Sequence, residues 1–392
     1  MRQCVRASDG ARALTNPRTH GPCKSVGSRY YSGVRILRTT ISCVAVAIFG
    51  LVSSHHGAAE GLFFPLVERW TTTRESPPAF RAAFDDTHAY IARRDNQLDA
   101  LSLQTGKLDW SVECPMTAPP VAGGGSVFSG GDRSVEARSQ RDGTVRWRTS
   151  VDGKIDSLYW DTDWLIAATD KGLLLAIRAA DGEVLWRRDV GAKLQAAPAP
   201  AADRLYVPVQ NGALTALDLK TGEQIWSVQF AKPVSGVLAA GDRVYAGSLD
   251  KKFYCLSIRR GHIEWSWRTG AAVVGVPAID TRRVYFVALD NVLRALNRHS
   301  GSMEWSKSLP TRPSAGPLLR GWTLVVPGIT AELHAFSALT GVPIADQLLL
   351  SPEKQEMQFI GPPHLTANDV LITVTRGGQI NALVGSPAPY GP

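Results

Sequence analysis

Five histidines and two cysteines outside the N-terminal segment are the side chains best suited to bind a metal or to act as nucleophiles. They are His88, His262, His299, His334, His364, Cys114 and Cys255. No histidine has a second His or Cys at the spacing of a zinc site, so we interpret the histidines as solvated turn residues. The sequence also lacks a Gly-x-Ser-x-Gly elbow, a phosphate loop and paired catalytic carboxylates. We therefore predict no catalytic residue, no metal and no cofactor, and expect that the protein is not an enzyme.

Seven arginines form the other group that could carry a function, because arginine is enriched where proteins bind one another. They are Arg204, Arg243, Arg259, Arg260, Arg282, Arg283 and Arg298. Asp203, Asp242 and Asp280 are interleaved with them and reduce the net charge. A solvated rim without a partner is the alternative interpretation. The choice depends on the elements that carry these residues.

A repeat of glycine and tryptophan runs through the chain and defines those elements. Six tryptophans recur every 37 to 40 residues, and each follows a glycine by four positions. The tryptophans are Trp110, Trp147, Trp186, Trp226, Trp265 and Trp305, and the glycines are Gly106, Gly143, Gly182, Gly222, Gly261 and Gly301. The turn recurs at Thr340-Gly341 without its tryptophan, and Trp70 precedes the series without a turn. Such regularity indicates a repeat architecture.

Each period contains four short segments with strand character. In residues 187–226 they are LQAAPAP, RLYVPVQ, ALTALDL and EQIW, separated by Ala-Asp, Asn-Gly and Thr-Gly turns. The glycine after Thr or Asp supplies the positive φ of a tight hairpin. Four antiparallel strands in about 40 residues are typical of a propeller blade. We interpret each tryptophan, Trp70 included, as a structural spacer between blades, whose burial contributes roughly 4–6 kcal/mol.

The sequence thus predicts an all-β fold, an eight-bladed β-propeller of four-stranded antiparallel blades over residues 60–385, with a short tail at 386–392. Seven units end at residues 110, 147, 186, 226, 265, 305 and 345. Residues 346–384 supply three more strands, around QFIGPPH, VLITVTR and QINALVG. The N-terminal strand at 66–73 is expected to pair into this C-terminal blade, which removes an exposed edge.

This topology brings the turns between first and second strands and between third and fourth strands to the same face. The seven arginines fall at these turns in blades four to six, which predicts an arginine-rich candidate partner face. Trp160, Trp164 and Trp322 lie near first-to-second turns and are candidate partner anchors. Cys114 and Cys255 fall in blades one and five, on opposite sides of the ring, which excludes a disulfide and predicts packed thiols.

The motif A-L-x-x-x-T-G-x-x-x-W, complete at Ala100–Trp110 and Ala216–Trp226, resembles the repeat of the PQQ-like (pyrrolo-quinoline quinone) β-propeller superfamily. Degenerate copies are EARSQRDGTVRW, LAIRAADGEVLW, YCLSIRRGHIEW and RALNRHSGSMEW, and the resemblance covers residues 66–384. The superfamily includes quinoprotein dehydrogenases and non-enzymatic eight-bladed proteins similar to the BamB lipoprotein of outer-membrane protein assembly. Because one fold hosts many activities, the resemblance is specific for fold only.

Resemblance to the quinoproteins would imply PQQ held over a calcium ion, with a catalytic Asp and with Glu and Asn ligands. The inner segments of this chain are instead small, apolar and rich in proline: APPVAGGG, QAAPAPA, VSGVLAAG, VVGVPAID and SAGPLLRG. Calcium needs six to eight oxygen ligands, usually including carboxylates. Asp242 and Asp280 fall at turns and are interpreted as solvated turn residues. No catalytic residue can be transferred from that branch.

Residues 1–59 are predicted to be a leader. Arg35 and Arg38 precede twelve uncharged residues, ISCVAVAIFGLV (41–52), and small residues up to Ala59 fit a cleavage site. Residues 1–33 have no evident pattern, and Val34 is an alternative start that leaves 34–59 as the signal peptide. An uncleaved membrane anchor is the alternative, although twelve residues are short for a bilayer core. Cys43 lies near the start of the run, so the lipid-acceptor cysteine of the BamB-like branch is missing.

The formal net charge of +8 is concentrated in the leader. Residues 1–59 hold eight basic residues and one acidic residue, whereas the remainder holds 35 basic and 34 acidic residues, a net charge of +1. A nearly neutral body has no field that tracks phosphates, so we predict no nucleic-acid partner.

The sequence alone therefore predicts an exported, monomeric and non-catalytic propeller. We expect a protein-interaction or scaffolding module of the bacterial cell envelope, as in outer-membrane protein assembly, with envelope proteins as unidentified partners. Membrane contact is expected only through an uncleaved leader. The alternative is a quinoprotein dehydrogenase-like or small-ligand-binding propeller that uses the central channel.

Overall fold

The computed structural model describes residues 62, 64–348 and 358–386. The predicted leader at 1–59, the alternative start at Val34 and residues 387–392 of the predicted tail lie outside the described residues. No described residue belongs to a helix with the length and hydropathy needed to cross a bilayer.

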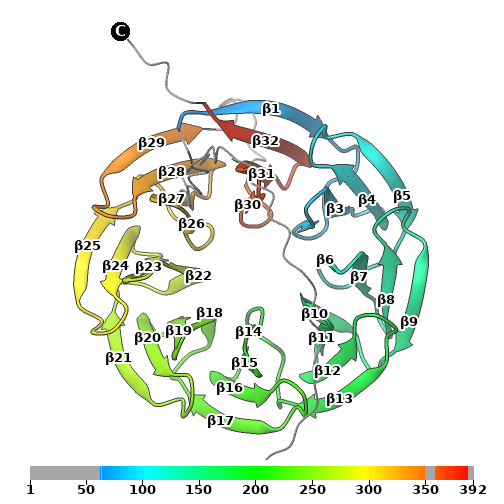
Figure 1. Ribbon diagram of the computed structural model, residues 1–392, viewed down its shortest axis with the longest axis horizontal. Helices are drawn as coiled ribbons and strands as arrows, with labels where there is room; N and C mark the ends of the chain where they lie inside the picture. Colours follow the sequence, from blue (N-terminus) through cyan, green and yellow to red (C-terminus); the bar gives the residue numbers. More distant parts are fainter. Residues whose placement is uncertain (1–61, 63, 349–357, 387–392) are drawn as a thin grey trace, which may run out of the picture. The chain divides into compact units, whose positions relative to one another are not determined.

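Within the described residues, 32 strands form eight antiparallel sheets of four strands each, arranged around an axis (Figure 1). Blade 1 is β2 (Ala83–Phe84), β3 (His88–Ala92), β4 (Gln97–Ser102) and β5 (Leu108–Glu113). Blade 2 is β6 (Val121–Gly123), β7 (Ser126–Gly130), β8 (Ser134–Ser139) and β9 (Val145–Ser150). Blade 3 is β10 (Ile155–Asp161), β11 (Trp164–Thr169), β12 (Leu173–Arg178) and β13 (Val184–Asp189). Blade 4 is β14 (Ala199–Ala201), β15 (Arg204–Pro208), β16 (Ala213–Asp218) and β17 (Gln224–Gln229).

The remaining blades follow the same order from the axis outward. Blade 5 is β18 (Val234–Ala240), β19 (Arg243–Ser248), β20 (Lys252–Ser257) and β21 (Ile263–Arg268). Blade 6 is β22 (Val273–Ile279), β23 (Arg283–Ala288), β24 (Val292–Asn297) and β25 (Met303–Ser308). Blade 7 is β26 (Leu318–Arg320), β27 (Thr323–Pro327), β28 (Glu332–Ser337) and β29 (Pro343–Leu348). Blade 8 is β30 (His364–Leu365), β31 (Val370–Val374), β32 (Gln379–Gly385) and, as its outer strand, β1 (Leu66–Thr73).

Blade 8 confirms the predicted closure of the ring. Strand β1 pairs antiparallel with β32, and Trp70 lies opposite Ala382 in the register. Figure 1 shows the first and last strands side by side at the rim. The first strand of this blade is shorter than the segment QFIGPPH suggested, because Phe359 forms only an isolated bridge to Thr375 before β30 begins.

Burial explains why each strand has its sequence pattern. The second and third strands lie between neighbouring blades, so residues such as Leu205 in β15 and Leu217 in β16 are fully buried. Together with Ile166 of β11 and Leu174 of β12, they form one hydrophobic cluster shared by blades 3 and 4. The outer strands have one face to solvent and therefore alternate in exposure, as β21 does.

Each repeat tryptophan contacts the turn glycine of the next blade. Trp186 of blade 3 lies against Gly222 of blade 4, where a Cβ atom would come within 2.7 Å of the indole ring. The same contact joins Trp70 to Gly106, Trp110 to Gly143, Trp147 to Gly182, Trp226 to Gly261, Trp265 to Gly301 and Trp305 to Gly341. In every case the indole Nε1 donates to the carbonyl three residues before that glycine, at 2.8 to 3.2 Å. The indole therefore packs against one blade turn and is hydrogen-bonded to it.

The tryptophan that is missing after Thr340-Gly341 has a structural explanation. The position is Ala345, opposite Ala335 in β28, as Trp305 is opposite Ala295 in β24. The next blade is blade 8, whose third and fourth strands come from opposite ends of the chain. In the described residues, no turn glycine joins those two strands, so an indole at Ala345 would have no such turn to contact.

Candidate functional site

The histidines occupy three kinds of environment. His262 and His299 are exposed in third-to-fourth turns, as the sequence indicated. The interpretation of all histidines as solvated turn residues is wrong for His334, of whose side chain only 3% is exposed. It is also wrong for His88, which is half-buried in β3 with its Nε2 2.8 Å from Asp109. His364 is half-buried and stacks on Phe84, with ring centroids 4.1 Å apart and planes at 1°. No group of three or more His, Cys, Asp or Glu in the described residues could hold a metal ion.

His334 forms a relay that resembles the contacts of a nucleophilic triad. Its Nε2 lies 2.8 Å from the Thr311 hydroxyl, and its Nδ1 lies 2.8 Å from Asp346. A Cβ on Gly328 would stand 2.4 Å from the same hydroxyl, so the backbone of Gly328 lies directly against it. The relay joins β28 and β29 to the segment between β25 and β26 that carries Thr311.

Both cysteines of the described chain are buried and free. Cys255 in β20 lies opposite Trp265, at the position that Ala295 occupies opposite Trp305. Burial raises the pKa of the Cys255 thiol to about 11. The thiol is therefore protonated near neutral pH and replaces an alanine in the packing of the blade.

Five of the seven predicted arginines are engaged within the propeller, one of them being Arg282 through Glu304. Arg204 of blade 4 donates to the Ile258 carbonyl of blade 5 at 2.6 Å, and Arg243 forms an ion pair with Glu264. Arg283 pairs with Glu304 at 2.6 Å. Arg298 of blade 6 donates to the Tyr245 hydroxyl of blade 5 at 3.1 Å.

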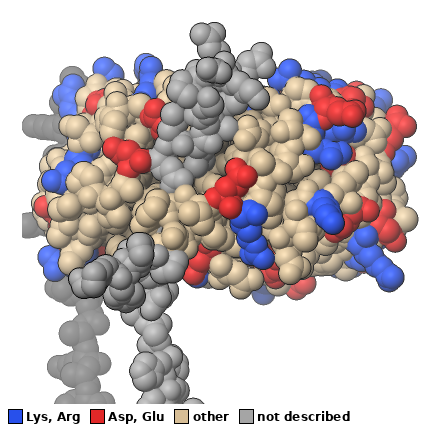
Figure 2. Space-filling model, turned by 90° about the horizontal axis from the view of Figure 1, so that it is seen from above, with Lys and Arg blue, Asp and Glu red and all other residues tan. Residues whose placement is uncertain are grey.

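Arg259 and Arg260 are exposed, and Arg282 is exposed as well, although its Nε donates to Glu304 at 2.8 Å. All seven lie on the face formed by first-to-second and third-to-fourth turns, which we call the upper face. Figure 2 shows the ring from the side, with basic and acidic side chains interleaved over the visible surface. Among the seven arginines, Asp203 lies 3.6 Å from Arg204, Asp242 lies 3.6 Å from Arg243 and Glu304 lies 2.8 Å from Arg282. The arginines therefore do not form a continuous positive patch, and their role as a partner face stays a prediction.

Blade 7 presents an apolar patch on the upper face, formed by Trp322, Leu339 and Val342, which we call the blade 7 patch. Trp322 is 47% exposed, Leu339 63% and Val342 55%. The backbone bond from Ala338 N to the Trp322 carbonyl, 2.8 Å long, brings their two turns together. Large exposed apolar groups gathered in one place are typical of an interaction site.

The same positions in the other repeats carry polar or small residues. The residues at the position of Trp322 are Thr87, Gly125, Asp163, Asp203, Asp242 and Arg282. The residues at the position of Leu339 are Gln104, Arg141, Ala180, Lys220, Arg259 and His299. The residues at the position of Val342 are Lys107, Thr144, Glu183, Glu223, His262 and Ser302. Trp322 was predicted from the sequence as a partner anchor, whereas Leu339 and Val342 were not, although the turns of the other repeats are polar or small at the same positions. Trp160 instead lines the central cavity, and Trp164 packs against the cluster of blades 3 and 4.

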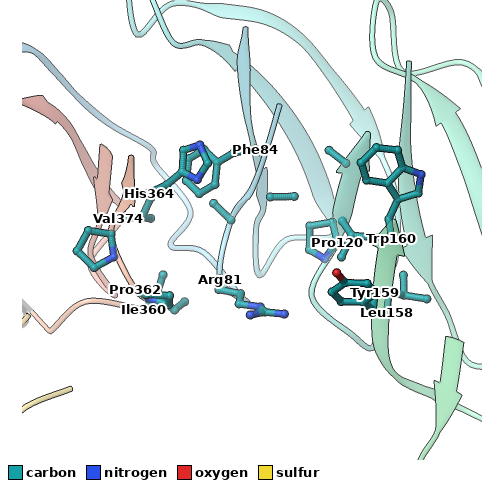
Figure 3. A pocket seen from close by; sticks show the side chains of 16 residues that line it. Arg81, Phe84, Pro120, Leu158, Tyr159, Trp160, Ile360, Pro362, His364 and Val374 are labelled. Carbon is teal, nitrogen blue, oxygen red and sulfur yellow. The ribbon is translucent and has the colours of Figure 1, made fainter. Parts of the chain in front are cut away.

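A cavity of about 440 Å³ opens at the axis between blades 8, 1, 2 and 3. Figure 3 shows Arg81 in it, with the Phe84–His364 stack on one side and Tyr159 and Trp160 on the other. No Asp or Glu is among the described residues that line it. The lining therefore does not fit a quinone held over a calcium ion, because calcium requires several oxygen ligands. Arg81 was not identified from the sequence, since a single arginine before a short strand carries no pattern.

Comparison with known proteins relates the chain to one family. The family model described as outer membrane protein assembly factor BamB matches residues 67–158, 131–239 and 210–386. The protein of that name from Yersinia pestis is 25% identical over 336 residues, covering 77% of this chain and 83% of that protein. The one from Escherichia coli (strain K12) is 26% identical over 297 residues, covering 68% and 75%.

Solved structures show the same fold. The crystal structure of BamB from Moraxella catarrhalis superposes with a TM-score of 0.68 at 14% identity, covering 84% of this chain and all of that one. The C-terminal WD40 domain of Sif2 gives the same TM-score at 10% identity, covering 83% of this chain and all of that one. At these identities the likeness establishes the propeller fold and no more.

Proposed function

The chain belongs to the family described as outer membrane protein assembly factor BamB, and on this basis we propose that it is a non-catalytic, protein-binding propeller of the cell envelope that acts in outer-membrane protein assembly. Relatives from Yersinia pestis and Escherichia coli carry that name. Export through the predicted leader places the protein in the envelope. Mass spectrometry of the mature N-terminus tests that step, and a terminus at Glu60 is expected.

The observation that carries the proposal is the blade 7 patch. Three turn positions that are polar or small in the six other repeats are tryptophan, leucine and valine here, and all three are exposed. Arg282 in blade 6 and Arg259 and Arg260 in blade 5 follow on the same face, and all are exposed. An aromatic and aliphatic centre beside arginines is the composition of protein interfaces. We propose a partner whose surface combines apolar with acidic groups.

The test is recovery of envelope proteins by affinity purification with the full chain as bait. The first variant combines Trp322→Ser, Leu339→Lys and Val342→Thr, and the second combines Arg259→Glu and Arg260→Glu. Each is expected to lose the partner that the unaltered chain recovers, with the melting temperature unchanged. Arg282 and Arg283 are left intact because their ion pairs with Glu304 belong to the fold.

A matched control reverses two exposed lysines on the opposite face. Lys154 and Lys171 are exposed, so the variant Lys154→Glu, Lys171→Glu changes charge as much as the arginine variant does. It is expected to retain the partner. Equal recovery by all three variants would contradict the proposed surface, and loss in the lysine control alone would move the interface to the opposite face.

A further inference from the structure

We propose that the axial cavity between blades 8, 1, 2 and 3 binds a carboxylate attached to an apolar group, with Arg81 pairing with the carboxylate. The proposal is independent of partner binding, because the cavity lies at the axis and the blade 7 patch lies at turns of the upper face. It rests on the donors in the cavity, on the way Arg81 is held and on the shape of the walls.

The cavity lining carries a few side-chain donors, Arg81 and Tyr159 among them, and no described lining residue is acidic. No acceptor of the described chain lies within hydrogen-bond or ion-pair distance of the Arg81 guanidinium. Several other arginines of the fold have a carboxylate partner, as Arg74 has in Asp99 at 2.8 Å. The Arg81 side chain is exposed to solvent, and the protein around it lowers the pKa of its guanidinium by desolvation. A guanidinium that stays charged in such a place favours an anionic ligand.

A second donor faces the same space. Tyr159 in β10 lines the cavity, and Figure 3 shows its hydroxyl on the side toward which Arg81 extends. Burial raises the pKa of Tyr159 to about 12, with the charge of Asp161 as the lesser cause, so the hydroxyl remains a donor. Arginine and a phenol together offer donors suited to the oxygens of a carboxylate.

The backbone of blade 8 fixes the position of Arg81. Arg81 lies just before β2, the short inner strand of blade 1, and Gly361 of blade 8 lies against its stem. A Cβ added to Gly361 would stand 2.8 Å from the Arg81 Cβ. The guanidinium is therefore presented by a packed stem, which reduces the entropy lost when a ligand binds.

The walls are flat and apolar and suit the body of the ligand. They include Pro120, Leu158, Ile360 and the Phe84–His364 stack. Burial lowers the pKa of His364, so the ring is neutral near neutral pH and Arg81 is the charged member of the described lining. A volume of about 440 Å³ is within the usual range for small-molecule sites.

A second cavity of about 500 Å³ shares Phe84, Ala122, Trp160 and His364 with the first and extends toward the upper face. Asp85 and Asp86 line it. Their negative charge disfavours a carboxylate there, so a long ligand places its carboxylate at Arg81 and its other end toward the aspartates. A free organic acid and the C-terminus of a peptide both supply this chemistry.

Calorimetric titration of the full chain with matched acids and amides tests the proposal. The small probes are 3-phenylpropanoate and 3-phenylpropanamide, and the peptide probes are acetyl-Ala-Val-Leu with a free carboxylate and with a C-terminal amide. The acid of a pair is expected to bind about tenfold or more tightly than its amide, because a hydrogen bond to a charged group contributes that much. Preference for the peptide acid identifies a chain terminus as the source, and preference for the small acid identifies a free metabolite-sized acid.

Variants locate the site. Arg81→Gln is expected to abolish the preference for the acid without changing the melting temperature. Arg94→Gln is the matched control, because Arg94 is an exposed arginine of blade 1 outside the cavity lining, and it is expected to keep the preference. Tyr159→Phe removes only the hydroxyl and gives a second readout if Arg81→Gln folds poorly. It is expected to weaken binding of the acid several-fold and to leave the affinity for the amide unchanged. Equal binding of acid and amide, absence of binding at millimolar concentration, or an Arg81→Gln variant that behaves as Arg94→Gln would overturn the proposal.

Discussion

Trp186 and Gly222 show at the scale of residues how one blade is joined to the next. The Trp186 indole is 8% exposed, and its Nε1 donates to the Leu219 carbonyl at 2.8 Å. Gly222 has φ +71°, which disfavours a side chain, and its Cα faces the indole ring. Glycine is thus required twice at this turn, once by its backbone conformation and once by the tryptophan of the preceding blade.

A double-mutant cycle on this pair separates the two requirements. Trp186→Ala should lower the free energy of unfolding by about 3–5 kcal/mol, because it empties a nearly buried indole site. Gly222→Ala should also destabilise, through φ strain and through the contact with the indole. In the double variant the added Cβ no longer meets an indole. The stability losses of the two single variants should therefore sum to more than the loss measured for the double variant. Denaturant unfolding measures all four proteins, and strict additivity would show that glycine serves the backbone alone.

His364 gives a prediction about pH. Burial lowers its pKa, so the folded protein resists protonation of a ring that the unfolded chain protonates near its ordinary pKa of about 6.5. The contribution of this histidine to stability is therefore present above that pH and is lost as the pH falls through the folded-state pKa. His364→Phe, which keeps a ring on Phe84, should lose less stability on acidification than the unaltered protein. Unfolding free energies measured across this range check the difference, and parallel pH profiles would contradict it.

At the scale of elements, the sequence predicted what repeats and missed what differs between blades. The regular spacing of the tryptophans from Trp110 to Trp305 indicated the blades, because each blade has to bury its two faces against the blades on either side. The target of each indole was not predictable, because the glycine that it contacts lies in the following blade. Whether Arg204 or Arg243 contacts solvent or a partner within the protein could not be predicted either, since the answer depends on Ile258, in the turn after β20, and on Glu264 in β21.

The cavity could not be predicted because it arises from an asymmetry of the inner strands. Gly236, Gly275 and Gly316 bring blades 5, 6 and 7 into backbone contact, since a Cβ on Gly236 would stand 2.1 Å from the Gly275 carbonyl oxygen. On the other side of the axis, β2 and β30 have two residues each and leave space. The small residues in VSGVLAAG and VVGVPAID were visible in the sequence, but their consequence for the opposite side of the ring was not.

At the scale of the whole propeller, the described ring is closed by seven indole contacts and by the pairing of β1 with β32. Blade 8 differs from the other blades because its outer strand is not joined to its third strand by a turn. Strand β1 therefore has two roles there: it covers the edge of β32, and it carries Trp70 to Gly106 of blade 1. Repeat proteins draw stability from contacts between neighbouring units, so loss of this strand opens the ring at one joint.

A chain that begins at Ser76 should therefore melt at a lower temperature than a chain that begins at Glu60, and should associate through the exposed edge of β32. Thermal unfolding and size-exclusion chromatography measure the two effects. Trp70→Ala in the longer chain is the matched control, because it removes the indole contact and keeps the strand pairing. This control should melt between the other two chains and remain unassociated. If the shortened chain melted with the control and eluted as a monomer, the indole would account for the joint and strand pairing would contribute nothing.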